Sequence, residues 1–296
     1  MPVAVHADFQ LDLRDHFAAE LLRLGIPAPA STGVEDVCTA FYNVRRKLIA
    51  PHPRTVRRSR ELQGRQLDPG KQDALNLVEL EALHGADLGP RLSKKLLNPA
   101  YNDGLLNDWG IHHLHLGMEV ESDGFVTRTA EILYVFVLPE ALLFIDVLAH
   151  GAESFATEEL IQIIHDNWPD ALAADRAHNA EPGSLSPASR TPTQRTAMRR
   201  KFTMTTQVAD GTIYVPPGGG IVTTGLSLSV RRAVDHQLDL ARLVEVWARN
   251  HADAIRDKIY RDQGQFLDEL RLRYVAEEPP RVLELQAWAD LVVPMG

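Results

Sequence analysis

ILYVFVLPEALLFIDVLA, residues 132–149, is the most apolar window of the chain. Its length is close to that of a membrane span, but it contains Pro139-Glu140 and an aspartate, and it is rich in β-branched and aromatic residues. This composition favours strands over a membrane helix, and Pro139-Glu140 is typical of a tight turn. The window therefore predicts the two buried strands of one hairpin, within residues 127–137 and 141–149.

Predicted helices flank this hairpin on both sides. Apolar residues spaced three and four apart define each of them. The predicted helices lie at 8–25, 34–49, 71–85, 88–97 and 157–167. Residues 54–60 are expected as loop or strand, and residues 109–120 as a further strand. We expect the centre of the molecule to be an antiparallel sheet with helices packed on one face.

The second half of the chain predicts a linker, a short hairpin and further helices. Residues 173–196 are rich in Ala, Ser, Pro, Thr and Arg and show no hydrophobic period, which is typical of a linker. Asp210-Gly211 is a turn signal between two predicted strands, 202–208 and 212–215. A long helix is predicted over 227–262, and a last one over 265–274.

Together these elements predict an α+β fold. A length of 296 residues suits one large domain or two ordinary ones. Four consecutive parts are expected: a helical region with a basic segment, an α+β core with a histidine-rich strand, a linker, and a region of β-hairpin and long helix. Their limits are 1–95, 96–172, 173–200 and 201–296.

Charge is unevenly distributed along the chain. The formal net charge is −9, whereas residues 45–71 hold nine Lys and Arg against two acidic residues, a local charge of +7. Such asymmetry indicates a surface that binds a polyanion such as RNA. Arg54, Arg57 and Arg58 are its predicted contacts with the phosphate backbone. The alternative is a solvated helix face followed by a basic loop.

Cys38 is the only cysteine, which excludes a disulfide within the chain and a cysteine-based zinc site. The residues after Met1 include neither a basic start nor an apolar core, so no signal peptide is expected. With the apolar window assigned to strands, no membrane contact is expected either. A reducing compartment fits, and we expect a cytoplasmic protein.

NDWGIHHLHLG, residues 107–117, holds three of the twelve histidines within four residues. Side chains alternate between the two faces of a strand. His113 and His115 therefore point to one side, and His112 points to the other. Two imidazoles on one face suit both proton transfer and metal binding.

The second strand of the predicted hairpin supplies a further histidine. His150 stands at its end, just before a glycine, where functional side chains are common. Arg128 stands at the entrance to the first strand. If these strands lie close together, we expect His113, His115 and His150 to converge, with Arg128 beside them.

Histidines in this arrangement suit cleavage of RNA by its own 2′-hydroxyl group. The reaction needs a base, an acid for the leaving 5′-oxygen, and a cation for the extra phosphate charge. Imidazoles fill the first two roles at neutral pH, and Arg128, Lys94 or Lys95 would fill the third. The leading hypothesis is a metal-independent ribonuclease, a hydrolase that binds RNA and uses no cofactor.

Two alternatives stay open. Clustered imidazoles also bind divalent transition metals, so the second hypothesis is a metal-dependent enzyme with a zinc, iron or manganese site. Its ligands would be His113, His115 and His150, or Glu119. The third hypothesis is a non-enzymatic protein that binds a partner through the helix predicted over 227–262, with structural histidines.

The layout of residues 88–170 resembles the small toxin ribonucleases of the RelE, barnase and EndoU type, the BECR group. The shared features are helices first, then a strand with clustered histidines, an apolar hairpin, and His150-Gly151 at the end of a strand. The resemblance implies a metal-independent endoribonuclease that serves as a toxin or antiviral defence effector, accompanied by an inhibitor or antitoxin protein. It also implies His113 or His115 as the base and His150 as the acid. Arg128 or Lys95 would steady the phosphate.

Overall fold

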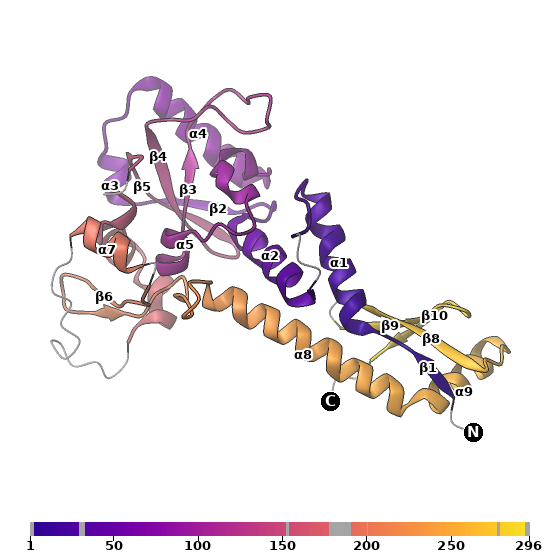
Figure 1. The fold of residues 1–296 in the computed structure, drawn as a ribbon. Coiled ribbons are helices and arrows are strands. Elements are labelled where there is room, and N and C mark those ends of the chain that lie inside the picture. The colour runs from indigo at the N-terminus through magenta and orange to yellow at the C-terminus, as the bar shows by residue number, and fades with distance from the viewer. Residues whose placement is uncertain are drawn as a thin grey trace. The chain divides into compact units, whose positions relative to one another are not determined.

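The computed structural model describes residues 3–29, 33–151, 154–177, 191–199, 201–276 and 279–293. The chain divides into two compact units, and Figure 1 labels most of their helices and strands. The central unit is Asn43–Ser229, and the terminal unit combines Met1–Tyr42 with Val230–Gly296. The expected α+β fold is confirmed. The units differ from the four consecutive parts expected, because the two ends of the chain pair in one sheet.

A four-stranded sheet forms the middle of the central unit. Its strands are β2 (Thr55–Arg58), β3 (Ile111–His115), β4 (Glu131–Val137) and β5 (Ala141–Ala149). They lie in the order β2-β5-β4-β3 (Figure 1), with β2 parallel to β5 and the other pairs antiparallel. The predicted hairpin is confirmed as β4 and β5. No helix in the described part of the chain is long and apolar enough to cross a membrane.

Helices cover both faces of this sheet. They are α3 (Arg60–Gly64), α4 (Pro69–His84), α5 (Gly104–Trp109) and α6 (Glu159–Asn167). Leu75 of α4 packs on the face that carries Leu133, whereas Ile161 of α6 packs on the face that carries Ile132. The expectation of helices on one face is therefore wrong. The reason lies in β4 and β5, which carry large apolar side chains on both sides and need two layers to bury them.

A β-bulge interrupts the pairing of β4 with β5. The register shifts between Tyr134 and Val135, so β5 holds one extra residue at this point. Before the bulge, Phe144 packs on the α4 side of the sheet, and after it the even-numbered Leu148 packs on the α6 side. The bulge has therefore reversed the face of the strand's last residues. His150, two residues beyond Leu148, follows on the α6 side.

The predicted linker contains regular structure in the central unit. A short 3₁₀ helix covers Pro169–Asp175, and α7 (Pro192–Met198) begins with a capping box at Thr191. Residues 178–190, the rest of that linker, lie outside the described residues. The next hairpin is confirmed but short, with strands β6 (Thr206–Gln207) and β7 (Ile213–Tyr214).

Two further predictions in the central unit need correction. The helix expected over 88–97 is a pair of 3₁₀ helices, Gly89–Arg91 and Lys94–Leu97. The strand expected over 109–120 is shorter, because α5 extends to Trp109 and Gly110 ends it in the left-handed conformation (φ 71°). His113 and His115 remain on one face of this shorter strand, β3.

The terminal unit holds a second sheet in the order β1-β8-β9-β10. Its strands are β1 (Ala4–His6), β8 (Glu269–Val275), β9 (Arg281–Glu284) and β10 (Ala289–Val292). Helices α1 (Phe9–Arg23) and α9 (Ala252–Gln263) lie entirely within this unit. Helix α2 (Val34–Lys47) begins here and ends in the central unit, whereas α8 (Leu228–Asn250) begins in the central unit and ends here. The helix expected over 227–262 is thus two helices. The helix expected over 265–274 is wrong: β8 buries every second residue and is a strand.

Candidate functional site

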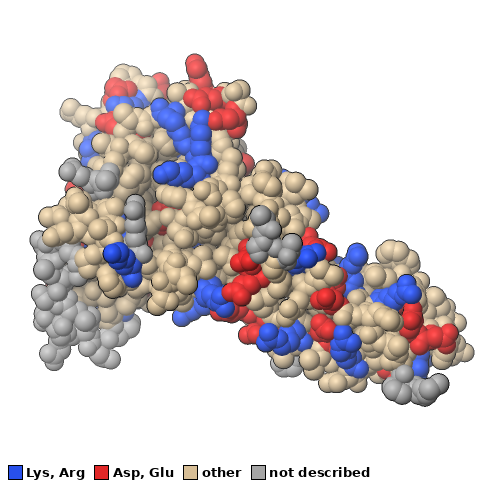
Figure 2. All heavy atoms as spheres, in the orientation of Figure 1, with Lys and Arg blue, Asp and Glu red and all other residues tan. Residues whose placement is uncertain are grey.

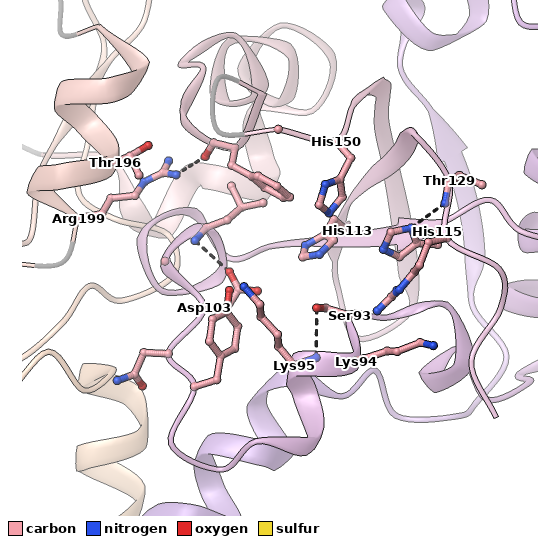
Figure 3. A pocket seen from close by; sticks show the side chains of 17 residues that line it. Ser93, Lys94, Lys95, Asp103, His113, His115, Thr129, His150, Thr196 and Arg199 are labelled. Atoms are coloured by element: carbon pink, nitrogen blue, oxygen red, sulfur yellow. Dashed lines mark hydrogen bonds between the residues drawn. The ribbon is translucent and has the colours of Figure 1, made fainter. Parts of the chain in front are cut away.

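A cavity of about 730 Å³ opens in the central unit. Its walls come from β3, from the segment after β5, from the Lys94–Leu97 3₁₀ helix, from the start of α5 and from α7 (Figure 3). Volumes of this size are typical of sites for small molecules or for one part of a larger ligand. Every described residue that lines the cavity belongs to the central unit.

Three histidines meet in this cavity. One ring nitrogen from each of His113, His115 and His150 lies within 4.8 Å of those of the other two. The ring centroids of His115 and His150 are 5.5 Å apart, and the ring of His113 lies 6.3 and 6.2 Å from them. The structure thus brings together the three imidazoles that the sequence singles out (Figure 3).

The rings meet although their strands are not neighbours in the sheet. β4 lies between β3 and β5, and the contact forms where these strands end. There the His150 N–H donates to the Ala130 carbonyl over 2.6 Å, which fixes the chain just before β4 begins. The Phe155 ring packs edge-on against His113 at 5.0 Å and against His150 at 5.3 Å, and so forms an apolar wall beside both rings.

Two of the three imidazoles are neutral at pH 7. His113 is 8% exposed and His115 is 3% exposed, whereas His150 is open to solvent. Burial is the main reason that the pKa of His113 lies below its usual range; nearby Asp103 opposes the shift. Burial, followed by the Arg128 charge, lowers the pKa of His115 to about 3.

A hydrogen bond selects the tautomer of His115. The backbone N–H of Thr129 donates to His115 Nδ1 over 3.3 Å, so the single proton of the neutral ring is on Nε2. His115 is therefore a hydrogen-bond donor through Nε2. A histidine bound to a metal usually donates from its second ring nitrogen to a carbonyl or carboxylate. Metal binding through Nε2 of His115 would require the bond from Thr129 to break.

Cations lie beside the histidines. Figure 2 shows Lys and Arg side chains gathered over the part of the central unit that carries β3 and β4, with carboxylates at their edge. Lys94 is paired with Glu121 at 2.9 Å and also with Asp123. Lys95 and Arg128 form no ion pair within the described residues. Their charges are therefore the ones available to an anion.

The contacts of Lys95 and Arg128 keep both side chains at the cavity. Lys95 Nζ lies 5.1 Å from the centroid of the Tyr101 ring, and Arg128 Nη1 donates to the Leu92 carbonyl over 3.0 Å. Asp103 is the one acidic residue among the described residues of the lining. Its Oδ1 accepts the N–H of Leu105 at 3.0 Å and thereby caps α5, so part of its charge serves the helix.

The predicted RNA contacts Arg54, Arg57 and Arg58 do not line the cavity. Arg54 is buried and donates to main-chain carbonyls, among them that of Ala50 at 2.7 Å. Arg58 is paired with Glu79, and Arg57 is exposed on β2. Much of the basic segment is used in the same way, since its cations hold loops and helix ends together.

Arg199 and Thr196 also line the cavity, and sequence reasoning missed them. They belong to α7 and its C-cap, inside the stretch predicted as a linker. Their helix lacks apolar residues spaced three and four apart, which is the pattern that predicted the other helices. The Thr191 cap before Pro192 and Gln194 was the signal that could have located α7.

Comparisons of the chain with protein-family models, with curated proteins and with solved structures found no match. The likeness to BECR-type ribonucleases therefore stays a hypothesis. Any function of the chain has to be inferred from the geometry and charge of its cavity.

Proposed function

We propose that the chain is a metal-independent endoribonuclease that cleaves RNA in this cavity. One observation carries the proposal: three imidazoles, two of them neutral, converge beside cations without carboxylate partners. Cleavage by the 2′-hydroxyl group needs this combination of base, acid and positive charge. Because the neutral rings are buried, the scissile phosphate has to enter the cavity, which favours an unpaired strand.

The environment of each ring suggests its role. Neutral His113 takes the 2′-hydroxyl proton as the 2′-oxygen attacks phosphorus. His150 gives a proton to the 5′-oxygen as the bond from phosphorus to that oxygen breaks, which leaves a 2′,3′-cyclic phosphate. His113 then releases its proton to solvent, and His150 takes one up. His115 donates a hydrogen bond from Nε2 to a phosphate oxygen, while Lys95 and Arg128 balance the added negative charge.

The biological role would follow the BECR resemblance. We propose a cytoplasmic toxin or antiviral defence effector, because an unrestrained ribonuclease harms the cell that makes it. That cell would then need an inhibitor or antitoxin protein. The cavity is where such a protein would have to bind or exclude RNA.

The closeness of the three ring nitrogens favours one second candidate, a metal-dependent enzyme. Zinc binds imidazole nitrogens at about 2.0–2.1 Å, and the three ring nitrogens are close enough together to be its ligands. Zinc binding would require a different hydrogen bond at His115. This requirement, together with the repulsion between a metal cation and the nearby Lys95 and Arg128, favours acid–base chemistry without a metal.

The test is cleavage of total cellular RNA, including transfer RNA, by the purified protein in EDTA. We expect cleavage, and a loss of at least about 100-fold in the His113→Ala/His115→Ala double variant. His236→Ala, which alters an exposed histidine outside the cavity, is the matched control. Intact RNA, or equal cleavage by the double variant, would refute the proposal. Activity lost in EDTA and restored by zinc or manganese would favour the metal-dependent enzyme.

The pH dependence of kcat/KM tests the role of His113. Its pKa lies below the usual value of about 6.5. The base therefore stays unprotonated down to pH values below 6.5, and activity falls only as the pH drops through the lowered pKa. An acidic limb above pH 6.5 would contradict this assignment.

A further inference from the structure

The cavity has a second cationic wall, formed by Arg199. Figure 3 shows Thr196 and Arg199 to one side of the histidines, away from Lys94 and Lys95. The RNA-cleaving roles proposed above use none of the groups on this side. Its chemistry therefore needs a separate explanation.

Arg199 is held in place by several contacts, but one of its hydrogen-bond donors has no acceptor among the described residues. Its Nε donates to Asp108 Oδ2 over 2.7 Å, its Nη1 donates to the Phe155 carbonyl, and its guanidinium lies 4.0 Å from the Trp109 ring centroid. The side chain is 5% exposed. Its remaining nitrogen, Nη2, is buried and has no hydrogen-bond partner within the described residues. A buried charged donor without an acceptor is costly, so a ligand oxygen at this position is favoured.

Thr196 adds a second donor at the same wall. It stands three residues before Arg199 on one turn of α7, so both side chains face the same direction. Its Oγ1 is buried and likewise has no partner among the described residues. A guanidinium nitrogen and a hydroxyl group are typical partners of phosphate oxygens.

We propose that Arg199 and Thr196 form a second phosphate subsite, which binds a phosphate of the RNA strand next to the scissile one. The inference rests on the proposed function, and it specifies the substrate further. Lys95 and Arg128 would hold the scissile phosphate on one side of the histidines, and Arg199 would hold its neighbour on the other. A substrate with two phosphates then binds better than one with a single phosphate.

Binding of uncleavable 2′-deoxy dinucleotides tests this subsite apart from cleavage. The probes are a dinucleotide with its one internal phosphate and the same dinucleotide with an added 5′- or 3′-terminal phosphate, measured by calorimetry. We expect one of the two added phosphates to tighten binding by roughly tenfold or more, because a hydrogen bond to a charged group has this strength.

Two variants locate the added affinity. Thr196→Val keeps the side-chain shape but removes the donor, and Arg199→Lys keeps the charge but removes the fork of nitrogens. Both should bind the singly phosphorylated probe as wild type does, and should lose most of the gain from the added phosphate. Thr224→Val and Arg232→Lys, at exposed positions outside the cavity, are matched controls that should keep the gain.

The outcomes separate this inference from the ribonuclease proposal. Cleavage of RNA without any gain from a second phosphate, or a gain that persists in Thr196→Val and Arg199→Lys, would overturn the subsite. A gain that these variants lose, in a protein that cleaves no RNA, would support the subsite and refute the ribonuclease. Thermal unfolding of each variant shows whether a lost gain reflects lost folding instead, in which case Thr196→Val is the deciding variant.

Discussion

His112 differs from its two neighbours because it points to the opposite side of β3. Both of its ring nitrogens are buried without a hydrogen bond in the described part of the chain, although the backbone of Arg46 lies near. Burial is the main cause that lowers its pKa to about 4. His112 therefore lies on the same strand as His113 and His115 but does not line the cavity. We assign it a structural role.

This buried ring makes stability depend on pH. Below pH 6.5 the unfolded chain protonates His112, whereas the folded chain resists protonation down to about pH 4. The unfolded state then binds more protons, so the free energy of unfolding falls as the pH falls. From pH 7.5 to pH 4.5 this one residue should account for a loss of about 2 kcal/mol.

We therefore expect the free energy of unfolding of His112→Leu to fall by about 2 kcal/mol less than that of wild type between pH 7.5 and pH 4.5. Urea unfolding at pH 7.5 and pH 4.5, followed by circular dichroism, measures the difference. His236→Leu, at an exposed position, should behave as wild type does. An unchanged pH dependence in His112→Leu would show that this ring is protonated in the folded protein.

The α7 helix is attached by charge rather than by apolar packing. Arg195 is fully buried, forms an ion pair with Glu158 and lies 3.5 Å from Asp108. Arg199, which caps the helix, lies 2.7 Å from the same Asp108. Both guanidinium groups stack over the ring of Trp109. Asp108 is therefore the shared counter-charge that holds the helix at the cavity wall.

We expect Asp108→Asn to reduce the free energy of unfolding by about 3 kcal/mol, because it leaves two buried guanidinium groups without their shared carboxylate. Urea unfolding measures the loss. Asp239→Asn removes an exposed partner of Arg242 and should change stability by less than about 0.5 kcal/mol. Equal effects of the two substitutions would contradict the role assigned to Asp108.

Across the molecule as a whole, an acidic chain presents a small cationic cavity. The net charge is −9, and most cations of the basic segment 45–71 form internal contacts, such as Arg65 with Asp146 and Lys71 with Glu131. Attraction for RNA should therefore be confined to the cavity, where Lys95, Arg128 and Arg199 are the cations that face a ligand.

This confinement predicts a weak dependence of RNA affinity on salt. With about three phosphate contacts, the slope of log K against log salt concentration should be about −2 for a single strand. Fluorescence anisotropy with a labelled 2′-deoxy oligonucleotide, from low to high salt, gives the slope. A slope steeper than about −4 would mean that the strand also contacts cations outside the cavity.

Local sequence was sufficient for the strands β3, β4 and β5 beside the site. Alternation along residues 111–115 placed His113 and His115 on one face, because a strand's geometry sets the direction of each side chain. The apolar run 132–149 similarly predicted β4 and β5. The same rule, applied to 269–275, would have found strand β8 in place of the expected helix, since its buried residues alternate there.

Non-local contacts decided the rest. Strand order, the bulge in β5 and the position of α7 depend on residues far apart in the chain. The bulge carries His150 to the side of the sheet where His113 and His115 lie, and pairing of Asp108 with two arginines brings α7 to the cavity. Hydrophobic periodicity cannot predict such contacts, because it indicates only on which side of its own helix or strand each residue lies. The types of the histidines and the shared face of His113 and His115 were therefore readable along the chain. The face of His150 and the meeting of all three rings in one charged cavity depended on packing between distant segments.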